Sequence, residues 1–182
     1  MVPAVVMLTL AGLVYRGSSQ AFGDLDGTGS AAASGSALVV TDVSGRPLTG
    51  SPLDLRGLLP GASGTRCVKV TYTGGPAVVL RLYGTDRTVS GQFDRWLRLR
   101  VTAGPTGRPG CPAAMTGAIV FDGPFDRFPT DPAIAGWSRW LDGRSRESVV
   151  FAITYRLSAG APSSVAGARA AMGLAWNIAQ AG

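Results

Sequence analysis

The sequence predicts an all-β protein, a single jelly-roll-like or Ig-like antiparallel β-sandwich. Several segments alternate apolar and polar residues with a period of two, which is typical of strands with one buried face. The 182 residues include 26 glycines and 12 prolines, a content that favours many turns. With 46% hydrophobic residues, a chain of this length can bury one ordinary core. We therefore expect one domain, preceded by a short N-terminal extension.

Residues 1–21 are expected to form an apolar helical leader, which is either a secretory signal peptide or an N-terminal anchor. Residues 2–14 are almost entirely apolar, and a run of this length suits a signal peptide better than a membrane span. Ser19 and Ala21 fit a cleavage site before Phe22. Since no basic residue precedes the apolar run, either the true start lies upstream or the leader is an uncleaved anchor.

A flexible arm is expected over residues 22–36, where Gly, Ala and Ser predominate. The chain then becomes apolar and β-like at Ala37–Val40, so the sandwich domain is predicted to occupy residues 37–182. The pattern alone leaves open whether this first apolar stretch pairs within its own domain.

Two of the predicted strands come early in the domain. Residues 66–72 place Val68, Val70 and Tyr72 on one face, and residues 77–84 follow after a Gly-Pro turn. Because a short turn separates them, we expect these two segments to be neighbouring strands. A third strand is predicted at residues 96–103, where apolar residues alternate with arginines.

The clearest strand pattern is at residues 147–157 and supplies the predicted core. Alternation puts Val149, Phe151, Ile153 and Tyr155 on one buried face. The last segment is rich in alanine, which allows a helix, but its large apolar residues recur with period two. A strand is favoured there because the segment before it resembles a hairpin loop, and Trp176 is then expected to join the core.

Residues 90–96 and 125–140 interrupt the alternation. We expect them to be crossover loops that contain one or two short helices.

Cys67 and Cys111 are predicted to form a disulfide. They are the only two cysteines, they lie 44 positions apart, and neither belongs to a C-x-x-C motif. Closing a loop of that length stabilises the fold by roughly 4 kcal/mol in the chain-entropy description. The alternative is two buried free thiols in a reducing cytosol.

The composition argues against an enzyme and against a cofactor or metal. The chain has no histidine, which excludes Ser-His-Asp and Cys-His catalysis and His-ligated zinc. A carboxylate-dependent hydrolase is the remaining enzymatic alternative, but the aspartates lie in turn-like contexts. The net charge of +6 comes from arginines scattered along the chain, a distribution that does not indicate nucleic-acid binding. An extracellular polymer is still allowed as a partner.

The motifs "SQAFGD", "SGSALVV" and "LLPGASG" follow one another along the chain, and paired strands are expected within residues 58–84. In this order they resemble elements of the TasA/camelysin family of biofilm-matrix and cell-surface fibre proteins. "GCPAAMTGAIVFDGPFDRF" and "GWSRW" resemble its two-cysteine branch. Gly23 and Ala62 depart from the family pattern. The metalloprotease activity described for camelysins is not carried over, because the chain has no histidine and no clustered carboxylates.

The resemblance implies a secreted or surface-displayed structural protein that self-assembles into fibres of an extracellular or biofilm matrix. Membrane contact would then occur only through the leader before its cleavage. The resemblance also implies assembly by N-terminal strand donation, with Ala37, Leu38, Val39 and Val40 as the assembly strand. Two alternatives remain open: this stretch is the domain's own first strand, and the protein is a monomeric surface sandwich that binds a protein or polymer.

Overall fold

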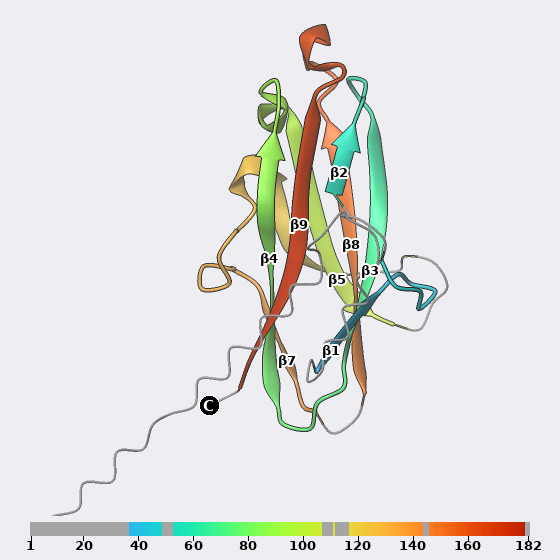
Figure 1. Cartoon of the computed structure of the whole chain (residues 1–182), viewed down its shortest axis with the longest axis vertical. Helices are drawn as coiled ribbons and strands as arrows, with labels where there is room; N and C mark the ends of the chain where they lie inside the picture. The colour runs from blue at the N-terminus through green and yellow to red at the C-terminus, as the bar shows by residue number, and fades with distance from the viewer. Residues whose placement is uncertain (1–36, 49–52, 107–110, 112–116, 144–145, 181–182) are drawn as a thin grey trace, which may run out of the picture.

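A computed structural model of the chain describes residues 37–48, 53–106, 111, 117–143 and 146–180. The predicted leader and the predicted arm lie outside these residues. The described residues form two antiparallel sheets that pack face to face (Figure 1), which confirms the predicted all-β sandwich.

The larger sheet has five strands. Their order across the sheet is β1 (Leu38–Thr41), β3 (Ser63–Tyr72), β8 (Glu147–Leu157), β5 (Leu97–Pro105) and β6 (Ala118–Pro124). The smaller sheet has four strands, in the order β2 (Leu53–Arg56), β9 (Arg169–Gln180), β4 (Val78–Val89) and β7 (Ser138–Leu141).

The strand pairing is that of a jelly roll. The pairs β2–β9, β3–β8, β4–β7 and β5–β6 nest inside one another, as they do when one long hairpin is rolled into a two-layer sandwich. The β5–β6 connection joins two strands of the same sheet, while the other connections cross from one sheet to the other. These eight strands complete the roll. β1 is additional to them and lies on the outer edge of β3.

Two expected neighbour relations were wrong. Residues 66–72 and 77–84 are strands, as predicted, but they belong to opposite sheets. Likewise β8 and β9 do not form a hairpin, because β9 pairs with β2 and β4. Apolar alternation reveals which face of a strand is buried, but a short turn can either close a hairpin or cross the ~10 Å between stacked sheets.

The crossovers contain short 3₁₀ turns. η1 (Phe93–Arg95) and η2 (Phe125–Arg127) lie in the two stretches where short helices were expected, and η3 (Ser163–Val165) follows β8. The stretch expected to be a loop up to residue 140 also contains β7. This strand has only four residues and a single buried side chain, Leu141, so it has too little alternation to be recognised.

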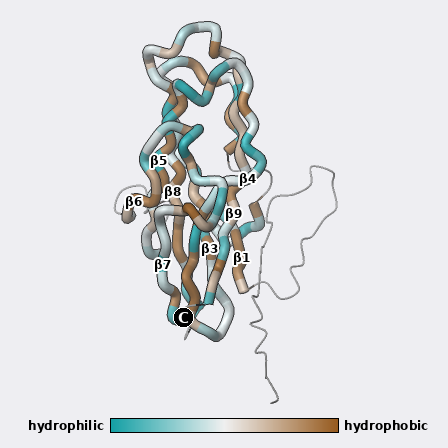
Figure 2. Tube along the Cα trace, turned by 90° about the vertical axis from the view of Figure 1, so that its left-hand side faces the viewer, coloured by the Kyte–Doolittle hydropathy of each residue, from teal (hydrophilic) through white to brown (hydrophobic). Residues whose placement is uncertain are grey.

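The core fills the space between the sheets, and Figure 2 shows hydrophobic residues concentrated along the strands. Val149, Phe151, Ile153 and Trp176 are all buried. The Phe151 ring centroid lies 5.7 Å from that of Trp176, so the two sheets meet at this pair. Tyr155 is half-buried and packs against this core.

Candidate functional site

Several of the described acidic residues make contacts that hold the fold together. The Asp42 carboxylate accepts hydrogen bonds from the backbone N–H groups of Ser44 and Arg46, each at 2.8 Å, and so closes a turn. Asp131 does the same for Ala133. Among the described residues, no cluster of three or more His, Cys, Asp or Glu side chains could hold a metal ion.

Asp54 is the most strongly perturbed acid and belongs to a surface ion cluster. Its carboxylate accepts hydrogen bonds from Arg56 at 2.9 and 2.7 Å and from Arg169 of β9 at 3.0 and 3.2 Å. These contacts, the Arg56 hydrogen bonds foremost, lower the pKa of Asp54 to about 2. The carboxylate is therefore ionised at neutral pH and unsuited to act as a general acid. It fastens β2 to β9.

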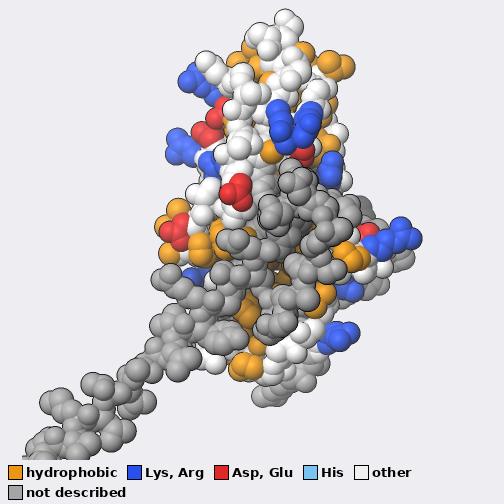
Figure 3. Space-filling model, in the orientation of Figure 1, with side chains coloured by type: hydrophobic (Ala, Val, Ile, Leu, Met, Phe, Trp, Pro, Cys, Tyr) orange, Lys and Arg blue, Asp and Glu red, His pale blue; other side chains and the backbone are white. Residues whose placement is uncertain are grey.

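Figure 3 shows basic and acidic side chains interspersed in small groups on the part of this face that the structure describes. None of the helices in the described ranges is long and apolar enough to span a membrane.

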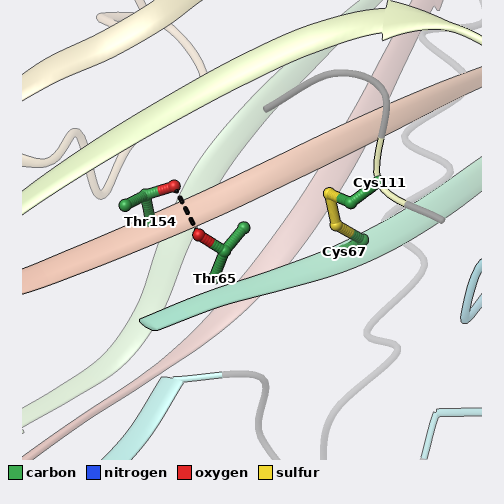
Figure 4. Close-up of a disulfide and its surroundings, with 4 residues drawn as sticks. All are labelled: Thr65, Cys67, Cys111 and Thr154. Atoms are coloured by element: carbon green, nitrogen blue, oxygen red, sulfur yellow. Dashed lines mark hydrogen bonds between the residues drawn. A yellow bond between two sulfur atoms is a disulfide. The ribbon is translucent and has the colours of Figure 1, made fainter. Parts of the chain in front are cut away.

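The structure pairs Cys67 with Cys111, as predicted, with their Cα atoms 5.8 Å apart (Figure 4). Cys67 lies on β3, and Cys111 lies in the connection between β5 and β6. Since β8 is the neighbour of β3 in the sheet, the disulfide places Cys111 against the outer face of β8. The two cysteines pack there against Val150 and Ala152, which are both buried. The sequence predicted the bond but not this covering role.

The candidate assembly strand lies on the protein's own β3. Residues 38–41 pair antiparallel with residues 69–72. Ala37 comes just before the strand, and its carbonyl oxygen accepts a hydrogen bond of 2.7 Å from the backbone N–H of Thr73. Leu38 points between the sheets with 7% of its surface exposed, and Val40 is half-buried. Val39 points to the opposite face and is 46% exposed.

The alternation of buried and exposed side chains therefore shows that Leu38 and Val40 face the core and that Val39 faces outward. Leu38 and Val40 lie on the inner side of the sheet beside β3, where Val70 and Tyr72 are buried. After Thr41 the chain reverses through the Asp42 turn and returns to a single bridge between Thr41 and Pro47. The short length of β1 and its position outside the eight-stranded roll make this edge the candidate functional site.

A scan against protein-family models and searches of the curated proteins and of the solved structures found no match to this chain. The TasA/camelysin resemblance consequently stays an expectation from the sequence.

Proposed function

We propose that this protein is a structural subunit of an extracellular fibre or biofilm matrix, and that β1 pairs with β3 of a neighbouring copy in the assembly. The observation that carries this proposal is the place of β1 outside the nested pairs of the jelly roll. The eight strands of the roll pair with one another without it. Removing β1 would expose one edge of β3 and leave those pairs intact.

Exchange of β1 between copies would cost little contact energy. The apolar surface beside β3 is the same in every copy, so Leu38 and Val40 would be buried to the same extent in either one. Each subunit would donate one strand and accept one, which is a head-to-tail interface that need not close into a ring. The disulfide supports an extracellular setting, because such bonds persist in oxidising compartments.

The experiment compares two aspartate substitutions at adjacent positions of β1, in protein that begins at Phe22. Leu38→Asp places a charge at a buried apolar position and should abolish fibres, because a buried unpaired carboxylate is strongly disfavoured. Val39→Asp adds the same charge on the exposed face and should leave fibres unchanged. Electron microscopy and light scattering measure assembly. Normal fibres from Leu38→Asp would refute strand exchange at β1.

The second candidate is a monomeric cell-surface sandwich that binds a polymer. A specific observation favours it: the arginine-rich surface described next, which lies on a different part of the molecule.

A further inference from the structure

Three arginines project side by side from the outer face of the five-stranded sheet. Arg98 and Arg100 lie on β5, where they alternate with the buried Leu97 and Leu99 and so face outward. Arg156 lies on β8 directly opposite Arg98 in the strand register. The three guanidinium groups therefore share one face.

Their charge is only partly balanced. Asp122 on β6 contacts Arg98 and Arg100, each at an N–O distance of 3.4 Å. Arg156 makes no ion pair within the described part of the chain. Three positive groups thus face one carboxylate, and the two side chains that contact it are largely exposed. Like charges directly opposite each other on a sheet are destabilising, so fold stability does not account for the Arg98–Arg156 pair.

Hydroxyl groups lie beside these arginines on the same face. Thr65 of β3 and Thr154 of β8 are hydrogen-bonded to each other at 2.9 Å (Figure 4), and Thr154 is opposite Arg100 in the register. Ser63 lies opposite Arg156. Across the described strands, the positions in register with Arg98 and with Arg100 contain no aromatic residue. This surface therefore offers no platform on which nucleic-acid bases could stack.

We propose that this arginine surface (Arg98, Arg100 and Arg156, with Thr65 and Thr154) binds an acidic polysaccharide. Guanidinium groups recognise sugar carboxylates through paired, charge-assisted hydrogen bonds. The neighbouring hydroxyls and the Asp122 carboxylate suit the sugar hydroxyl groups. Each site binds weakly, and a polymer that reaches several copies gains affinity from their number. This proposal does not rest on strand exchange, because the surface is complete in one chain.

The test measures binding of the full chain to polygalacturonate, with neutral dextran and single-stranded poly(dT) as comparison polymers. Arg98→Gln/Arg156→Gln should weaken polygalacturonate binding at least about tenfold in ~20 mM salt, and ~0.3 M salt should weaken wild-type binding similarly. The matched control is Arg46→Gln/Arg139→Gln. It removes the same charge from the β1–β2 connection and from β7, and should change affinity less than about twofold.

Thermal unfolding checks that the patch variant is folded. Because it removes like charges that face each other, its Tm should equal or exceed that of the wild type. Equal loss of binding in the two double variants would overturn the proposal in favour of net charge alone. Tighter binding of poly(dT) than of polygalacturonate, or no polygalacturonate binding by the wild type, would also overturn it.

Discussion

β1 and β2 are both edge strands of four residues, but they differ in how they are held. β2 buries Leu53 and Leu55 almost completely, whereas β1 buries only Leu38 to a comparable degree. Asp54 of β2 also contacts Arg169 of the neighbouring strand. β1 contains no charged residue, so it has no equivalent ion pair.

Their places in the topology explain this difference. β2 is the first strand of the jelly roll and pairs with the last, β9, so its loss would remove one of the nested pairs. β1 extends a sheet whose eight-stranded roll is already complete. An edge strand can thus either belong to the nested pairs of a fold or be added outside them.

The largest effect is expected on the free energy of unfolding when one leucine of each strand is replaced by alanine. Leu53→Ala should cost about 3–5 kcal/mol of unfolding free energy, because it opens a cavity in a fully packed site. Leu38→Ala should cost no more than about 2 kcal/mol, since the edge of the sheet can close around the missing atoms. Urea titration of both variants measures the difference. Equal losses would mean that β1 is as much part of the fold as β2.

A smaller effect concerns the ion cluster that anchors β2. The pKa of Asp54 is lowered to about 2 in the folded protein, so its stabilising contribution is complete above its ordinary value of 3.8 and is lost as the pH falls through about 2. For a partly exposed carboxylate this contribution is about 0.5–1 kcal/mol. Asp54→Asn should therefore be less stable than the wild type at pH 6, and the difference should vanish below about pH 2.

Hydrogen exchange shows where this contribution acts. At pH 6, Asp54→Asn should lose amide protection in β2 and retain it in β1, because Arg169 belongs to β9 and does not pair with β1. A stability difference that does not change with pH, or equal loss of protection in both strands, would contradict the anchoring role of Asp54.

Local patterns in the sequence predicted individual strands well. The bounds of β8 match the alternating segment at 147–157, because one face of that strand is packed along most of its length. The sequence also predicted the Cys67–Cys111 pair, since two isolated cysteines leave one choice. It did not reveal β7, whose exposed Trp140 and half-buried Arg139 interrupt any apolar pattern.

Relations between strands were not predictable in the same way. The turn at Gly74–Pro76 has the composition of a hairpin, yet it joins β3 to β4 in the opposite sheet. Which strands become neighbours depends on how surfaces pack across the whole sandwich, and a local sequence pattern does not contain this information. The arginine surface could not be predicted for the same reason. Arg98 and Arg156 are 58 positions apart in the sequence and become neighbours only when β5 pairs with β8.

The central claim is that β1 pairs with β3 of another copy in the assembly, and a disulfide trap tests it most directly. Val39 and Thr71 are opposite each other in the β1–β3 register, so cysteines at these positions would lie within bonding distance. Fibres of Val39→Cys/Thr71→Cys are oxidised after assembly and run on a non-reducing denaturing gel, with Val39→Cys alone as the control. Strand exchange predicts a ladder of covalent multimers that disappears on reduction and is absent from the control. Fibres in which the new bond is found only within single chains would contradict it.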